Sequence, residues 1–433
     1  MKIINTKNSN FKSEFETILQ RAKSDIKGVS KIVENIIDEI VAEGNEALKR
    51  HIEKFDKWQV KNDDDLLISQ EDMKKAYDNL DLNLKNSLHT AFDRIKNYHE
   101  KQLPKSWIDF EDNGTILGQK VTPVDRAGLY IPGGKAAYPS SLLMNAIPAL
   151  VAKVKEIVVC TPTPNNEVNE LLLAACYLCK VSKVYKVGGA SAIAAMAYGT
   201  KTIPKVDVIT GPGNIFVATA KKMVFGEVNI DMIAGPSEIG ILADESANPR
   251  YAAFDLLSQA EHDEMASSIM ITTDENLAKN VSLEVSNILE NLTRKEIAKK
   301  SIDERGAIIV ASDINEAIEL MNEIAPEHLE VMTKNPFELL PFIKHAGAIF
   351  LGENTPEPIG DYIAGPNHTL PTGGTAKFYS PLNVENFLKK SSIISFSKKA
   401  INDLGESCAL LADTEGLTAH AKSVRVRLEE KGE

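Results

Sequence analysis

The chain has 433 residues, of which 43% are hydrophobic and 25% are charged, a composition typical of a globular protein large enough for more than one core. Its 49 basic and 61 acidic residues give a net charge of −12, which argues against nucleic acid or an anionic membrane as the main partner. No apolar run approaches the roughly 18 residues that span a bilayer. The N-terminus shows no signal-peptide pattern, so we expect a cytoplasmic protein.

The first 105 residues or so are expected to be helical. Apolar residues recur every three or four positions in segments 11–23, 29–55 and 69–100, with charged residues between them. The histidines of this region are expected on the surface without a role: His51, His89 and His99.

Strands and helices alternate from about residue 121 onward. Short apolar segments at 156–160, 184–187 and 206–209 are typical of strands. Helices are expected between and after them, at 169–179, 190–198 and 214–224. Continuous apolar strands separated by helices indicate a parallel sheet that helices cover on both faces.

Two strand-to-helix turns of this segment are rich in glycine: Gly188-Gly189-Ala190-Ser191 and Gly211-Pro212-Gly213-Asn214. Ligands of open α/β sheets bind at the carboxyl ends of strands, where the free amides at a helix N-terminus suit a pyrophosphate. Neither turn matches the Gly-x-Gly-x-x-Gly pattern. A dinucleotide site and two tight turns without a ligand therefore both remain possible from the spacing.

A second alternating segment begins near residue 238. Strands are expected at 239–243, 268–272, 307–310 and 347–351, and helices at 251–264, 275–291, 314–324 and 336–345. The remainder is rich in loops and ends in a polar helix, at about 417–430. The predicted fold is therefore α/β, with two Rossmann-like parallel-sheet units, a helical N-terminal region and an extended C-terminal tail.

The four cysteines are too few for a disulfide framework. Cys176 and Cys179 have the spacing of a redox or zinc pair, but they lie in an apolar helical run and no second pair completes a zinc site. We expect buried, unreactive thiols there.

Candidate metal ligands lie at the end of the predicted helix 251–264. Gln259 and His262 are three residues apart, so on a helix they share one face. With Asp361 and His420 they would give a Zn²⁺ site with one negative charge. The alternative is a surface helix with a histidine, while Asp361 caps a loop and His420 lies on a helix surface.

A candidate acid–base pair follows Pro326, which interrupts the preceding helix. Glu327 and His328 then place a carboxylate beside an imidazole, which suits proton transfer near neutral pH. The alternative is an exposed pair at the start of a strand.

Taken in order, the motifs resemble those of the histidinol dehydrogenase family over about 300 residues. The stretches that carry the resemblance are Tyr130-Ile131-Pro132-Gly133-Gly134, Gly211-Pro212-Gly213-Asn214, Ala234-Gly235-Pro236-Ser237-Glu238, residues 255–262, 325–330, 346–352 and 360–374, and Glu415-Gly416-Leu417-Thr418-Ala419-His420.

The resemblance implies a zinc enzyme of histidine biosynthesis that oxidises L-histidinol to L-histidine through a bound aldehyde with two NAD⁺. It assigns the acid–base roles to Glu327 and His328, and NAD contacts to Tyr130 and Asn214. One Zn²⁺ per subunit would be held by Gln259, His262, Asp361 and His420. Substrate contacts would come from Ser237, Gln259, His262, His328, Asp361, Glu415 and His420.

The resemblance also implies an interlocked homodimer with shared active sites. It suggests an N-terminal arm (1–25), a metal and substrate domain (26–128 with 240–381), an NAD-binding domain (129–239) and a tail that reaches the partner subunit (382–433). One position departs from the family pattern, because Ser191 stands where the family usually has a glutamine that helps to bind the dinucleotide.

Two other functions use the same residues. A zinc hydrolase would use Glu327 to activate water on an amide, and a two-lobed binding protein would hold a structural metal without turnover. Of the remaining histidines, His368 is expected nearer the site than His345, because it lies in the loop after Asp361.

Overall fold

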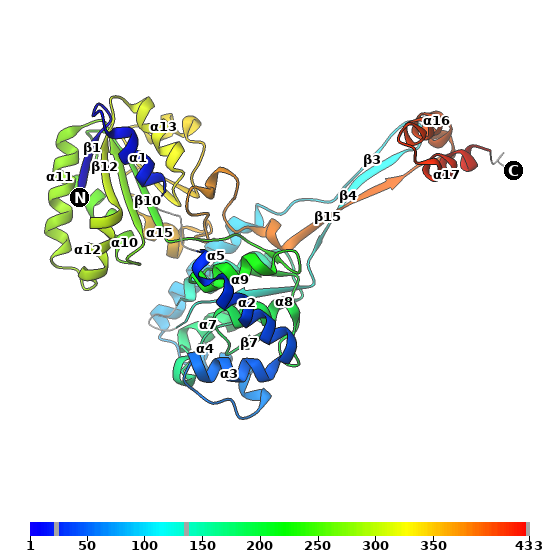
Figure 1. Cartoon of the computed structure of the whole chain (residues 1–433), viewed down its shortest axis with the longest axis horizontal. Helices are drawn as coiled ribbons and strands as arrows, with labels where there is room; N and C mark the ends of the chain where they lie inside the picture. Colours follow the sequence, from blue (N-terminus) through cyan, green and yellow to red (C-terminus); the bar gives the residue numbers. More distant parts are fainter. Residues whose placement is uncertain (21–25, 134–137, 430–433) are drawn as a thin grey trace. The chain divides into compact units, whose positions relative to one another are not determined.

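The computed structural model describes residues 1–20, 26–133 and 138–429. The chain forms two compact units (Figure 1), the larger of Met1–Gln102 with Val124–Phe387 and the smaller of Leu103–Pro123 with Leu388–Glu433. Among the described residues, no helix has both the length and the apolar character to cross a membrane.

The first sheet of the larger unit has six parallel strands in the order β1-β12-β11-β10-β13-β14. Its middle strands are buried at every position, as expected for a sheet covered on both faces. The strands are β1 (Lys2–Asn5), β10 (Glu238–Ala243), β11 (Ser267–Thr272), β12 (Gly306–Val310), β13 (His328–Met332) and β14 (Ala348–Leu351).

Helices form an apolar core on each face of this sheet. One core includes α10 (Pro249–Ala260), α11 (Glu275–Leu289) and α12 (Lys295–Arg305), and the other includes α1 (Phe11–Leu19) and α13 (Ile314–Ile324). The short helices α14 (Pro336–Leu339) and α15 (Glu357–Ile359) precede and follow β14, and a π-helical turn, Gly360–Ala364, continues from α15.

The second sheet has the order β2-β7-β6-β5-β8-β9, and all its strands are parallel except β2. The chain passes from β5 through β6 to β7 on one side and then returns to β8 on the other side of β5. The carboxyl ends of β5 and β8 therefore form a topological switch point, where ligands bind in open α/β sheets. The strands are β2 (Leu67–Ile68), β5 (Arg126–Tyr130), β6 (Glu156–Cys160), β7 (Lys183–Tyr185), β8 (Val208–Thr210) and β9 (Asn229–Ile230).

Helices from distant parts of the sequence cover the second sheet. One core joins α2 (Ile26–Glu43) and α3 (Asn45–Phe55) to α8 (Gly189–Tyr198) and α9 (Ile215–Val224). The remaining helices are α4 (Gln70–Asp78), α5 (Leu82–Glu100), α6 (Pro139–Val151) and α7 (Glu170–Leu178). Among these helices, α6 contacts α5, α7 and β5, and α7 also contacts α4.

The smaller unit is an antiparallel sheet with two helices. Strand β4 (Ile116–Pro123) pairs with β15 (Leu388–Ser395) and β3 (Trp107–Phe110). Helices α16 (Lys398–Thr414) and α17 (Thr418–Glu429) pack on each other, where Gly405 lies against Val424 and Leu428.

The predicted fold class is confirmed, with two parallel-sheet units of mixed α/β architecture. The grouping of residues 26–128 with the metal and substrate domain differs from the packing, because α2, α3 and β5 belong to the second sheet. The N-terminal segment also contributes strand β1 to the first sheet, and the tail contains β15 and α16, neither of which the sequence pattern predicted.

Candidate active site

The Glu327–His328 pair lies where β13 begins, and the main chain of Glu238 on β10 holds both side chains. His328 Nδ1 lies 3.0 Å from the carbonyl oxygen of Glu238, and Glu327 Oε2 accepts a hydrogen bond from the Glu238 N–H at 2.9 Å. Because a carbonyl only accepts, Nδ1 carries a proton. Nε2 is therefore the nitrogen that is available for chemistry.

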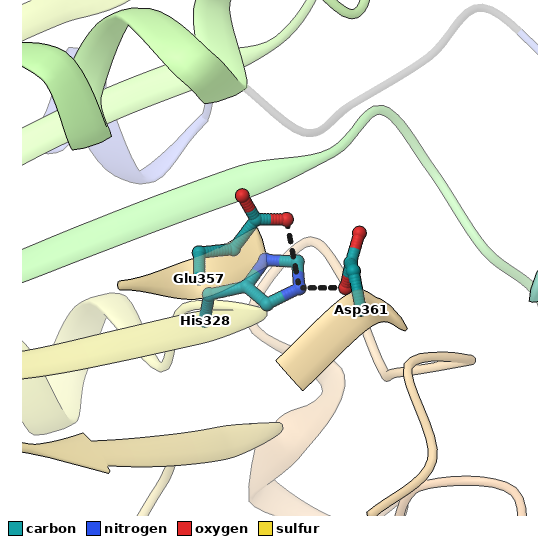
Figure 2. A group of neighbouring side chains, drawn as sticks. All are labelled: His328, Glu357 and Asp361. Atoms are coloured by element: carbon teal, nitrogen blue, oxygen red, sulfur yellow. Dashed lines mark ion pairs between the residues drawn. The ribbon is translucent and has the colours of Figure 1, made fainter. Parts of the chain in front are cut away.

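Two carboxylates face this nitrogen (Figure 2). His328 Nε2 lies 3.7 Å from Asp361 Oδ1 and 3.9 Å from Glu357 Oε1. Ligand atoms of these three residues lie within 4.8 Å of one another. Glu357 begins α15, its N–H donates to buried Glu330 Oε1 at 2.8 Å, and Asp361 follows one turn later. The group has the ligand types and spacing of a cation site.

Burial and mutual charge shift the pKa values of these groups. Burial raises the pKa of Glu327 to about 7 and that of Glu357 to about 8. Burial alone would lower the pKa of His328, but the carboxylates, led by Glu327, raise it to about 10. Burial raises the pKa of Asp361, yet its contact with His328 outweighs this and keeps the pKa below its usual value. The cluster therefore favours bound positive charge.

Gln259 lies at the end of α10, next to this cluster. Its side chain is fully buried, and neither amide atom has a hydrogen-bond partner in the described parts of the chain. The neighbouring Ser258 Oγ donates to Glu357 Oε2 at 3.4 Å. The oxygen and the nitrogen of the Gln259 amide are therefore both available to bind a ligand at the edge of the cluster.

The predicted helix 251–264 is shorter than expected, because α10 ends at Ala260, so Gln259 and His262 do not share a face of one helix. His262 lies in the turn that follows and is exposed. In the residues that follow, Asp263 Oδ1 accepts the Met265 N–H at 2.8 Å, which forms an Asx turn. The charges of Asp361 and His328 nevertheless act on the imidazole of His262, so the turn brings His262 near the cluster without the predicted helical geometry.

His368 belongs to the same site, since its Nδ1 lies 3.9 Å from Asp361 Oδ1. Several buried polar atoms at this place lack a hydrogen-bond partner among the described residues, and such atoms are rare unless a ligand binds them. They are both amide atoms of Gln259, His328 Nε2, Glu357 Oε1, Asp361 Oδ1 and His368 Nε2. This set of nitrogen and oxygen donors fits Zn²⁺.

The nucleotide-type features lie at the switch point of the second sheet. Tyr130 ends β5 and is buried, its hydroxyl accepts the Gly189 N–H at 3.1 Å, and burial raises its pKa to about 12. Asn214 is exposed and caps α9 by accepting from the amides of Phe216 and Val217. Gly134, at the end of the Tyr130 motif, lies outside the described residues.

Ser191 makes a contact that the sequence did not reveal. Its hydroxyl lies 2.9 Å from His51 Nδ1, and His51 Nε2 lies 2.9 Å from Glu39 Oε2. With His51 Nε2 donating to the Glu39 carboxylate, Nδ1 can accept a hydrogen bond from the Ser191 hydroxyl. The prediction of surface histidines was thus wrong for His51 and His99, which are 7% and 0% exposed.

The other predicted site residues are more scattered. Ser237 is partly exposed, precedes β10, and its carbonyl accepts the Ser267 N–H. Glu415 caps the C-terminus of α16, and His420 lies in the first turn of α17; both are exposed and belong to the smaller unit. That Glu415 and His420 belong to the same site as Asp361 stays a prediction.

The sequence model of the histidinol dehydrogenase family matches residues 19–428 of the chain. The chain belongs to the histidinol dehydrogenase family. Histidinol dehydrogenases from Sulfurimonas denitrificans and Wolinella succinogenes are 73% and 66% identical to it, with 98% and 99% of each chain covered. The crystal structure of histidinol dehydrogenase from Elizabethkingia anophelis superposes with a TM-score of 0.93 at 36% identity, covering 99% of this chain and 98% of that one.

Membership in the histidinol dehydrogenase family confirms the resemblance and makes the chain an oxidoreductase of histidine biosynthesis. The hydrolase and the binding protein are therefore set aside. The expectation for Cys176 and Cys179 is confirmed too, since both are unpaired and buried, and burial raises their pKa values.

Sequence reasoning missed Glu357, which contributes one of the two carboxylates at His328. Its spacing of four from Asp361 was a usable signal only if the segment were helical. Flanking Pro356 and Pro358 argued against a helix, although proline is tolerated in a first turn, where α15 places Pro358.

Proposed function

We propose that the chain oxidises L-histidinol to L-histidine through a bound aldehyde, using two NAD⁺ and one Zn²⁺ per subunit. The observation that carries this proposal is the fixed His328, with Nδ1 anchored on the Glu238 carbonyl and Nε2 facing Asp361 and Glu357, beside Glu327. This arrangement supplies a base, a second acid–base group and a cation site at one place.

The proposed zinc ligands are Gln259, His262, Asp361 and His420. The unpartnered amide of Gln259 and the carboxylate of Asp361 support the first and third of these. When bound, zinc would supply a positive charge that holds the nitrogen atoms of the substrate and offsets the carboxylates around His328. Asp361 and Glu357 would together orient the His328 imidazole.

His328 would act first, as the neutral imidazole that it becomes once a bound cation offsets the carboxylates that raise its pKa. Its Nε2 takes the proton of the substrate hydroxyl while the carbinol C–H leaves as hydride to NAD⁺, which yields the aldehyde and NADH. The ring cannot rotate away from this position without losing the 3.0 Å bond from Nδ1 to Glu238. That anchor keeps the base at one distance through both oxidations.

Glu327 would act in the second half of the reaction. One of its oxygens is held by the Glu238 N–H, and the other would take a proton from the water that adds to the aldehyde. The resulting hydrate loses a second hydride to a second NAD⁺ and becomes the carboxylate of L-histidine. Burial, which raises the pKa of Glu327 to about 7, makes it a stronger base than an exposed carboxylate.

The dinucleotide would bind at the switch point, near Tyr130 and Asn214. The turns at Gly189 and Gly211 follow β7 and β8, where free backbone amides suit a pyrophosphate. Further substrate contacts are proposed for Ser237, Glu415 and His420. The last two would complete a site shared within a homodimer, and the proposed location is the cytoplasm.

The test is turnover of L-histidinol with NAD⁺, followed by absorbance at 340 nm. The expected result is two NADH per L-histidinol, loss of turnover on chelation, and recovery with added Zn²⁺. Absence of NADH formation by the zinc-loaded protein would contradict the proposal, and one NADH per L-histidinol would contradict the second oxidation.

A further inference from the structure

The second sheet contains a buried ion pair that the proposed reaction does not use. Lys221 on α9 and Asp231, just after β9, are bonded to each other, with side chains 3% and 0% exposed. Burying two charges is costly, and an apolar pair fills the same space at no such cost. The pair therefore calls for an explanation beyond packing.

Both members of the pair hold the backbone of one residue, Gly211. Asp231 Oδ2 accepts the Gly211 N–H at 2.8 Å, and Lys221 Nζ donates to the Gly211 carbonyl at 2.9 Å. Asp231 Oδ1 also accepts the N–H of Met232. The two opposite charges thus bind the N–H and the carbonyl of one residue, which belong to the two peptide groups on either side of its α-carbon.

Gly211 needs such support because its backbone conformation is sterically restricted. Its φ is +118°, and a Cβ at this position would lie 2.0 Å from the carbonyl oxygen of Tyr130. The turn is therefore pressed against the end of β5 in a backbone region that favours glycine. Without the pair, the peptide groups of Gly211 would lose their buried partners, and the turn would be free to rearrange.

We infer that Lys221 and Asp231 are positioning residues that hold the Gly211-Pro212-Gly213-Asn214 turn in the shape that binds the dinucleotide. The inference rests on the proposed function, which places NAD⁺ at this turn. Neither side chain contacts the dinucleotide, because the polar atoms of both are already bonded to Gly211, to Met232 and to each other. Their effect is on the affinity for NAD⁺, and not on the chemistry at His328.

The test compares the KM values for NAD⁺ and for L-histidinol in two variants. Lys221→Met keeps the length of the side chain but removes the donor to Gly211 and leaves Asp231 unneutralised. Asp231→Asn keeps the shape of the side chain, but its NH₂ group then faces the N–H of either Gly211 or Met232, which both donate to Asp231. We expect the KM for NAD⁺ to rise about tenfold or more, the KM for L-histidinol to change less than about twofold, and kcat at saturating NAD⁺ to be kept.

The matched control is Lys205→Met, which breaks an ion pair with Glu227 in the same unit. That pair is 49% and 42% exposed and makes no contact with the turn, so its loss leaves both KM values unchanged. A merely structural pair would lower the unfolding temperature and the active fraction without separating the two KM values. Titration of NADH fluorescence reports the same affinity without turnover.

Equal behaviour of Lys221→Met and Lys205→Met, or an equal rise of both KM values, would overturn the inference. If Lys221→Met does not fold, Asp231→Asn decides by the same criteria. If neither folds, the pair serves the fold and not the turn, and the inference is also overturned. Failure of the proposed function is distinct, because the wild-type protein would then not reduce NAD⁺ at all.

Discussion

At the residue scale, the chemistry of the site depends on which atoms of each side chain are not already hydrogen-bonded to the protein. Glu327 and His328 are adjacent in the sequence, which indicated that they could act as an acid–base pair. It could not indicate that the main chain of Glu238, 90 positions away, fixes both of them. That fact depends on the pairing of β10 with β13, where Ile239 lies opposite His328, and periodicity within one segment carries no information about such pairing.

The two roles proposed for Glu327 and His328 are separable. Glu327→Gln keeps an oxygen that accepts the Glu238 N–H but cannot take a proton from water. We expect oxidation of L-histidinaldehyde to slow by about 10²-fold or more, and oxidation of L-histidinol to the aldehyde to slow much less. Single-turnover kinetics with each substrate measures the two rates, and equal losses in both would count against this division.

The His328 anchor predicts a difference between two amide substitutions. His328→Asn has an NH₂ group that reaches the Glu238 carbonyl, but it removes the base. We expect a loss of about 10²- to 10⁴-fold in kcat with an unfolding temperature close to that of the wild type. His328→Gln removes both the base and the anchor and should be less stable, so a Gln variant as stable as Asn would argue against the anchor.

At the element scale, the sequence predicted most strands and helices of the two sheets, because their apolar periodicity reflects burial. It failed where a local polar contact decides the outcome. Helix α10 ends at Ala260, and the Asx turn of Asp263 lies where the predicted helix continued to residue 264. The start of strand β13 was expected, in one interpretation, to carry an exposed Glu327–His328 pair, whereas both side chains are buried at the site.

The link between β13 and α15 gives an element-scale prediction. Glu330 Oε1 accepts the Glu357 N–H, and both residues are about 1% exposed. Glu330→Leu leaves that N–H without its partner, so we expect a loss of about 1–3 kcal/mol in the free energy of unfolding. Glu330→Gln retains an acceptor and serves as the control, and urea unfolding of the metal-free protein measures both. Equal stability of the Leu and Gln variants would show that the bond does not matter.

At the scale of the whole molecule, the chain folds as two units, and the order of motifs carried more information than any single motif. The resemblance identified the family correctly because its stretches run in order along the chain, and the family match extends over residues 19–428. The antiparallel sheet of the smaller unit could not be predicted in full, since β15 lies more than 260 residues from its partner β4 in sequence.

The buried carboxylates predict how the whole protein responds to pH. The folded-state pKa values of Asp255, Glu327 and Glu357 are raised by burial to about 6, 7 and 8. The folded protein therefore holds protons that the unfolded chain releases above about pH 4, so stability falls as pH rises through this range. We expect the Tm of the metal-free protein to fall by about 5 °C from pH 5 to pH 8.

Zinc-loaded protein should lose less stability over the same range, because the cation offsets the carboxylate charges and binds more tightly as its ligands lose protons. Thermal unfolding followed by circular dichroism, with and without Zn²⁺ at pH 5 and pH 8, checks both curves. A Tm of the metal-free protein that stays level or rises with pH would contradict the assignment of raised pKa values.

We propose that one zinc ion is held by Gln259, His262, Asp361 and His420, and that Glu357 is not required to hold it. The most direct measurement is the zinc content per subunit of His262→Asn, Asp361→Asn, His420→Asn and Glu357→Gln, each purified alike and assayed by inductively coupled plasma mass spectrometry. We expect the first three variants to lose most of their zinc and Glu357→Gln to keep about one ion per subunit. A zinc content of about one ion per subunit in the His262 and His420 variants, together with loss of zinc from Glu357→Gln, would contradict this account. That result would assign the ion to His328, Glu357 and Asp361.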